Sequence, residues 1–206
     1  MNRSGAADPS ENASRRPPGE PSCRALLRSA TQAPHERLHH HPGLSSVQNG
    51  TISLRDYRAL LGRLYGFYWP FERAISGDPL RTHWLAQDLA WLGVDATALA
   101  RIRTCAAIPR YDCSARRLGA LYVVEGSALG GRLLCRGLDQ LLGASHADGR
   151  RFFAGHGADT GMAWAAVMDR IAAMGAEPVG RAAMISAATE TFEVFENWLD
   201  GWGTAQ

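Results

Sequence analysis

Apolar residues recur every three or four positions along most of the chain, which is the spacing of amphipathic helices. The clearest run follows Ser53 and consists of Tyr57, Leu60, Leu61, Leu64, Tyr65, Tyr68 and Phe71. After residue 22 no segment shows the strict alternation that is typical of a strand. The pattern therefore predicts an all-α protein, with about seven helices packed in a single compact domain.

Capping residues and helix breakers set the expected boundaries. Ser53 and Thr97 are suitable N-caps, and Pro34 is expected to kink the first helix or to start it afresh. Pro42 and Gly43 predict a loop after that helix. The expected helices are 23–39, 53–76, 80–92, 97–105, 114–142, one from 164 onward, and 180–198.

Composition divides the chain into a tail and a domain. Residues 1–22 are rich in proline, glycine and polar residues, so we expect a disordered tail before a helical domain over 23–206. The chain is 46% hydrophobic and 20% charged, with a net charge of +2. These values indicate a globular protein and give no signal for nucleic acid or a membrane. Four cysteines without a CxxC pair favour reduced thiols and a cytoplasmic location.

The expected helix 114–142 contains Gly126, Gly130 and Gly131 near its centre. Each glycine inside a helix costs roughly 1 kcal/mol relative to alanine, so their presence needs a reason. Glycine lets a backbone approach a flat ligand closely, but it serves tight helix–helix packing equally well. The spacing of the three glycines alone slightly favours helix–helix packing over close approach to a ligand. No strand precedes this segment, which excludes a phosphate-binding loop.

His35, Glu36 and His39 form an H-E-x-x-H pattern, which in zinc peptidases places two imidazoles one helical turn apart. Here Pro34 directly precedes the first histidine, and no third ligand stands at a recognised spacing, so the pattern is weak evidence for zinc. A single histidine on a helix is also a suitable axial ligand for heme iron. The sequence of this helix alone leaves both chemistries open.

Two segments together resemble the heme oxygenase family. Residues 26–38 (LLRSATQAPHERL) resemble the proximal helix of these enzymes, and residues 118–131 (LGALYVVEGSALGG) resemble their distal helix in its bacterial form. Weaker similarity extends the resemblance over residues 26–198. The sequence is most similar to bacterial members, including those that supply biliverdin to bacteriophytochromes.

The resemblance implies that a b-type heme, both cofactor and substrate, is sandwiched between these two helices. His35 would be the axial ligand of the iron. Gly126 and Gly130 would bring the distal backbone close to the heme and to O2. The chain has no clear counterpart of the distal aspartate of mammalian members, and Ser127 is the nearest polar side chain that would hold a water molecule.

The remaining expected site residues also follow from the resemblance. Arg28 would face a heme propionate, and Phe192 would line the pocket from the last helix. A basic residue expected early in the helix after Phe153 is replaced by Ala165, so Arg170 is a possible substitute. A glutamate found in the proximal helix of some members is His39 here.

The implied reaction is the oxidative cleavage of heme to biliverdin with release of CO and ferrous iron. It consumes O2 and electrons from outside, because the chain has no flavin or nicotinamide signature. A ferredoxin or a flavin reductase is the expected donor, and a bacteriophytochrome is a possible acceptor of biliverdin. The alternatives are a non-catalytic heme- or tetrapyrrole-binding helical protein and, less favoured, a zinc peptidase.

Overall fold

The structure is a computed structural model that describes residues 21–75, 77–144 and 148–200. Within these ranges every regular element is helical, which confirms the all-α prediction. Most of the expected tail (1–20) lies outside the described residues. The elements are α1 (Cys23–His39), α2 (Pro42–Gln48), α3 (Leu54–Ala74), α4 (Leu80–Trp91), α5 (Ala96–Ala100), α6 (Ser114–Gly137), α7 (Asp139–Leu142), α8 (Arg151–Ala154), the 3-10 turn Gly157–Asp159, α9 (Thr160–Met174) and α10 (Pro178–Leu199).

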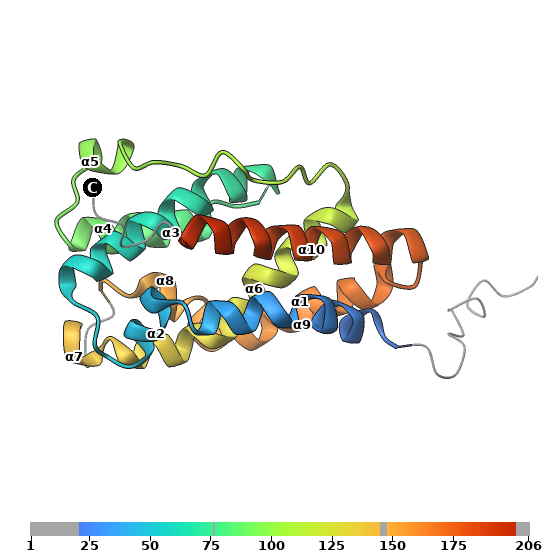
Figure 1. The fold of residues 1–206 in the computed structure, drawn as a ribbon, viewed down its shortest axis with the longest axis horizontal. Helices are drawn as coiled ribbons and strands as arrows, with labels where there is room; N and C mark the ends of the chain where they lie inside the picture. The colour runs from blue at the N-terminus through green and yellow to red at the C-terminus, as the bar shows by residue number, and fades with distance from the viewer. Residues whose placement is uncertain (1–20, 76, 145–147, 201–206) are drawn as a thin grey trace, which may run out of the picture.

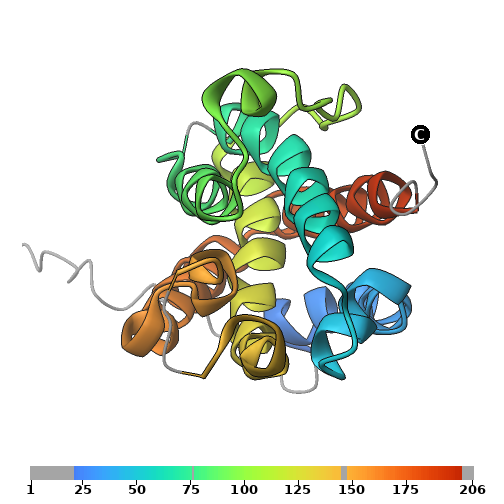
Figure 2. The ribbon, with the colours of Figure 1, turned by 90° about the vertical axis from the view of Figure 1, so that its left-hand side faces the viewer.

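Helix α6 runs through the middle of the molecule, and the other long helices surround it (Figure 2). It packs most extensively against α10, and also against α9, α2 and α8. The approach to α10 requires glycine at Gly119, since a Cβ there would collide with the carbonyl oxygen of Met184. Length and composition alone would let α6 cross a membrane, but a central core helix satisfies the same criteria.

Helix α1 lies alongside α10 and is held mainly by α10, α9 and α2, without extensive packing against α6 (Figure 1). The guanidinium of Arg37 binds both carboxylate oxygens of Glu196 on α10, with one contact of 2.7 Å. His41 accepts a hydrogen bond from the backbone N–H of Gly43 and donates one of 3.1 Å to the carbonyl of Leu199. These contacts fix α1 while leaving space between α1 and α6.

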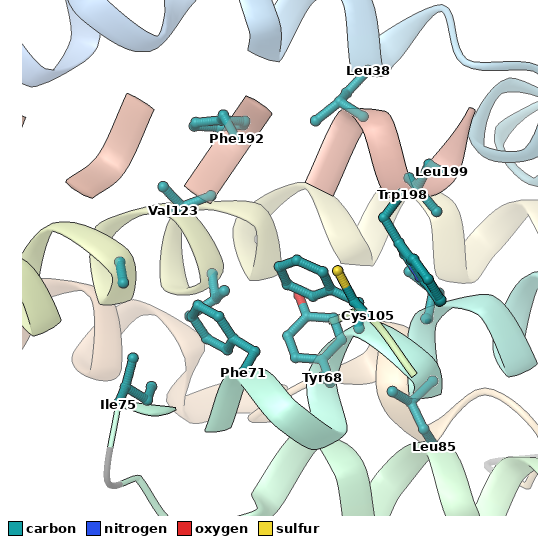
Figure 3. Close-up of a cluster of buried hydrophobic side chains, with 14 of the residues drawn as sticks. Leu38, Tyr68, Phe71, Ile75, Leu85, Cys105, Val123, Phe192, Trp198 and Leu199 are labelled. Carbon is teal, nitrogen blue, oxygen red and sulfur yellow. The ribbon is translucent and has the colours of Figure 1, made fainter. Parts of the chain in front are cut away.

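The hydrophobic core lies mainly between α3, α4, α6 and α10. Phe67 and Phe71 are almost completely buried and stack with ring centroids 5.4 Å apart. Figure 3 shows Phe71 and Tyr68 of α3 deep in this cluster, with Val123 of α6 and Phe192 of α10 towards α1. Some residues of the hydrophobic core therefore also line the space beside α1.

The described chain contains more and shorter helices than the seven expected. A loop was predicted at Pro42, but α2 begins there because the His41 side chain caps it and proline is favoured in the first turn. The cap predicted at Thr97 is wrong: Asp95 accepts from the N–H of Ala98 and starts α5 earlier. The predicted helix 114–142 is interrupted at Leu138, so that α7 is separate.

The other helix boundaries agree with the predicted ones or differ from them by a few residues. Ser53 caps α3 as predicted, accepting from the N–H of Asp56 at 3.1 Å. Helix α1 passes through Pro34 as one continuous element and does not start afresh there. Helix α9 begins at Thr160, before the predicted start at Trp164. Helix α4 ends before Gly93, whose φ of +83° suits glycine.

Candidate functional site

A groove separates α1 from α6, and it consists of two adjoining cavities. Both cavities are lined by His35 on α1, by Val123, Gly126 and Ser127 on α6, and by Phe192 on α10. Both cavities open to solvent and share these five lining residues. The shared lining makes them one continuous groove, which suits one elongated organic ligand rather than two small ones.

The two cavities differ in chemistry. The apolar chamber is lined mostly by hydrocarbon side chains, and its remaining walls are Leu38, His39, Leu44, Gln48, Phe67, Tyr68, Val124, Gly130, Leu133, Leu134, Thr191 and Phe195. The polar chamber holds the charged residues, and its remaining walls are Arg24, Arg28, Thr31, Gln32, Glu36, Tyr122, Leu129 and Trp164. The groove therefore suits a ligand with a large apolar body and an anionic end.

Helix α1 presents one face to both chambers. Ser22 starts the helix by accepting from the N–H of Ala25, and Leu27, Thr31 and Leu38 are buried along it. Because residues four apart lie on the same side of a helix, Arg24 and Arg28 stand in line with His35 farther along. Cations and imidazole therefore face the same groove.

His35 stands where the two chambers meet. Its ring contacts that of His39 edge-on, with centroids 4.6 Å apart, and faces Phe192 at 6.2 Å. Burial lowers the pKa of His35, and the nearby His39 lowers it further. At neutral pH the His35 imidazole is therefore neutral and keeps a lone pair, which is the form that a metal ion binds.

The three central glycines of α6 have different surroundings. A Cβ on Gly130 would meet nothing within 4 Å, since this position faces open space in the apolar chamber. A Cβ on Gly131 would lie 2.7 Å from the carbonyl oxygen of Phe153, so Gly131 serves helix packing. At Gly126 a Cβ would be in ordinary contact with Trp164, 3.4 Å away. Packing thus explains Gly131 but not Gly130.

Two hydroxyl groups lie on the α6 side of the apolar chamber. Ser127 donates a 2.8 Å hydrogen bond to the carbonyl of Val124 one turn back in α6. Tyr68 projects from α3, and burial raises the pKa of its phenol to about 12, so the phenol stays protonated at neutral pH. No sequence motif indicated Tyr68 beyond its place in the apolar run, because its position at the chamber wall depends on packing.

The predicted ligand-binding residues are only partly brought together. Arg28 lines the polar chamber and Phe192 lines both chambers. Arg170 is exposed on α9 and is not among the residues that line either chamber, so its predicted role finds no support. Arg24 was missed, although its spacing of four residues from Arg28 could have indicated it.

A buried charged cluster lies behind α6, and no sequence motif indicated it. Arg81 binds Glu125 at 2.7 Å and lies 4.0 Å from Glu72, while His156 is 3.5 Å from Glu125. Glu72 also accepts from the hydroxyl of Thr82 at 2.7 Å. Since Glu125 directly precedes Gly126, the cluster fixes the glycine-rich part of α6 to α3 and α4.

The zinc-peptidase alternative requires a third ligand. Among the described residues, no group of three histidine, cysteine, aspartate or glutamate side chains is placed to hold a metal ion. His35 and His39 contact one another at the groove without such a partner. The H-E-x-x-H pattern therefore does not form a peptidase-type zinc site in this part of the chain.

Comparisons with known proteins identify the family. The heme oxygenase family model matches residues 22–201, which include both helices that form the groove. The fold is similar to that of heme oxygenase-1 from the cyanobacterium Synechocystis, solved in complex with heme, with a TM-score of 0.68 and 16% identity over 89% of this chain and 93% of that chain. No curated protein sequence matches the chain. Because the family model covers nearly all of the described residues, the chain belongs to the heme oxygenase family and is an enzyme that degrades heme to biliverdin.

Proposed function

We propose that heme binds in the groove between α1 and α6, with His35 as the axial ligand of its iron. The observation that carries this proposal is the combination of groups in one groove. A neutral imidazole, two arginines and an open glycine position line a space that is otherwise mainly apolar. Heme has the matching chemistry, since it is a flat apolar dianion whose metal accepts one imidazole.

In this arrangement the two ends of the groove bind different parts of the heme. Arg24 and Arg28 supply two positive charges for the propionates, to which guanidinium groups donate charge-assisted hydrogen bonds. Leu38, Phe67 and Phe195 cover the apolar part of the ring and exclude bulk water. The ligand is thereby oriented with its carboxylates towards the start of α1.

The reaction site lies on the α6 side of the groove. When bound, heme supplies both the iron that reacts with O2 and the ring that is opened, and CO and ferrous iron leave with biliverdin. Gly130 leaves room for O2 because no side chain projects there. Tyr68 and Ser127 carry hydroxyls that hold water, and the neutral phenol of Tyr68 donates a proton in a hydrogen bond.

Electrons have to come from a separate protein, since the sequence lacks a flavin or nicotinamide signature. We propose a ferredoxin or flavin reductase as donor and a cytoplasmic location. The resemblance to bacterial members also supports a bacterial origin and a biliverdin acceptor such as a bacteriophytochrome.

Hemin oxidation by the purified protein tests the proposal. We expect the protein to form a complex with hemin that, on addition of ascorbate under air, loses its Soret band and yields biliverdin. Ascorbate replaces the native electron donor, so the result does not depend on the identity of that partner. A complex that keeps its Soret band and forms no biliverdin would instead identify a carrier, and would contradict the enzymatic proposal.

A further inference from the structure

Trp164 forms an aromatic wall of the polar chamber that neither the family match nor the sequence motifs explain. It lies near the start of α9, is half-buried, and lines this chamber together with residues of α1 and α6. Its six-membered ring lies 3.4–3.5 Å from the place that a Cβ on Gly126 would occupy. Its ring also packs against Tyr122, with centroids 5.5 Å apart and planes tilted by 42°.

Charge is distributed unequally around this wall. Three charged side chains line the polar chamber and all come from α1: the cations Arg24 and Arg28, and the anion Glu36, whose carboxylate accepts a 2.8 Å hydrogen bond from Gln32. The described residues that line it from α6 and α9 carry no charge, and Arg170 of α9 lies outside it. An anionic group in the chamber therefore finds cationic partners on the α1 side and an aromatic surface on the α9 side.

We propose that Trp164 fixes the in-plane orientation of heme, and so determines which edge of the ring is cleaved. This inference rests on the proposed binding of heme in the groove. A heme ring rotated about the iron–His35 axis keeps its apolar contacts but moves its carboxylates. Rotation towards α9 brings a carboxylate against the indole of Trp164, a bulky ring whose π system carries partial negative charge on its faces.

That rotated orientation is disfavoured for two reasons. The carboxylate leaves Arg24 and Arg28, and it loses water without gaining a hydrogen-bond partner, which is costly for a charged group. The bulk of Trp164 over Gly126 also narrows the chamber on this side. With the carboxylates held near α1, a single edge of the ring faces the open space at Gly130. Trp164 is thus a specificity-determining residue that acts through heme orientation.

The test measures heme orientation without turnover. Proton NMR of the ferric cyanide complex resolves the heme methyl groups, and each in-plane orientation gives its own set of resonances. We expect one dominant set in the wild type. In Trp164→Ala we expect the ratio of major to minor heme-methyl resonances to fall by roughly tenfold, which is the effect expected for a charged group without a partner. The mixture of biliverdin isomers should broaden in parallel. Trp164→Phe keeps the aromatic wall and should retain one dominant set.

Trp69→Ala is the matched control, because Trp69 is 41% exposed on α3, stacks on Tyr65 and lines neither chamber. It should leave the resonances unchanged. If Trp164→Ala does not fold, Trp164→Leu removes the aromatic face while keeping an apolar side chain, and the same change is expected. A folded Trp164→Ala or Trp164→Leu complex with one unchanged orientation overturns the inference and leaves heme binding intact. A wild type that does not bind hemin through His35 overturns both.

Discussion

At the scale of single residues, the structure distinguishes a glycine that faces the groove from a glycine that serves helix packing. Gly130 and Gly131 are neighbours in sequence and indistinguishable by spacing. Only the structure shows that Gly130 faces open space, whereas Gly131 lies against the backbone of Phe153. Sequence reasoning slightly favoured packing for the whole segment, and this interpretation holds for Gly131 but not for Gly130.

Alanine at these two positions should have opposite effects. In Gly130→Ala the methyl group meets no atom, so the free energy of unfolding should rise by up to about 1 kcal/mol, the helix-propensity gain. Biliverdin formation should fall, because the methyl group occupies the space proposed for O2. In Gly131→Ala the Cβ collides with Phe153, so stability should fall by about 1–3 kcal/mol.

Denaturation midpoints and biliverdin yield per folded molecule, measured on the same preparations, check both expectations. A Gly130→Ala protein that is less stable but fully active would contradict the role of Gly130 in the pocket. It would place Gly130 with Gly131 as a packing residue.

Several site residues could not be identified from the sequence because their roles arise only on folding. Tyr68 and Trp164 occupy apolar positions in their helices, and nothing in the local sequence indicates that they reach the groove. His35, in contrast, was predicted as an axial ligand because its neighbours in residues 26–38 resemble a known helix, and it lines the groove. The buried partners of Arg81 are distant in sequence and were not predictable for the same reason.

At the scale of elements, caps and hydrophobic periodicity located the long helices α1, α3, α4, α6 and α10. Among the short helices, α5 (Ala96–Ala100) was predicted over the longer range 97–105, and α7 was predicted as part of the helix 114–142. Helices α2 and α8 were missed because they depend on a side chain that caps a single turn or on tertiary contacts. Helix α8 shows this most clearly. Asp88 of α4 accepts hydrogen bonds from the N–H groups of Arg151 and Phe152 at 2.8 and 2.9 Å, and thereby fixes the start of this four-residue helix.

Asp88 also gives α8 a defined pH dependence. Burial raises the pKa of this carboxyl from its ordinary value of 3.8 to about 6, although the hydrogen bonds from Phe152 and Arg151 oppose the shift. The folded protein thus holds the proton more tightly than the unfolded chain does. The contribution of Asp88 to stability is therefore greatest below the unfolded pKa and declines as pH rises through about 6, by at most about 3 kcal/mol.

Urea unfolding of the wild type and Asp88→Asn across this pH range isolates the effect, because the variant lacks the titrating group. The free energy of unfolding of the wild type, relative to the variant, should decrease from about pH 4 to pH 7. A difference that stays constant or increases over this range would show that the Asp88 pKa is not raised.

At the scale of the whole molecule, the groove follows from how α1 is attached. Helix α6 is surrounded by α2, α8, α9 and α10, while α1 is fastened to α10, α9 and α2 and lacks extensive packing against α6. A space therefore remains between two helices that are held in place by shared neighbours. The resemblance predicted a ligand between these helices, and their attachment explains how the space is kept without one.

The central claim is that His35, and no other histidine, binds the iron of a heme held in this groove. The most direct test is the absorption spectrum of the ferric hemin complex of His35→Ala, with His39→Ala as the control on the same face of α1. We predict that His35→Ala loses the imidazole-ligated spectrum and that added imidazole restores it, while His39→Ala resembles the wild type. A native spectrum in His35→Ala together with its loss in His39→Ala would contradict the claim.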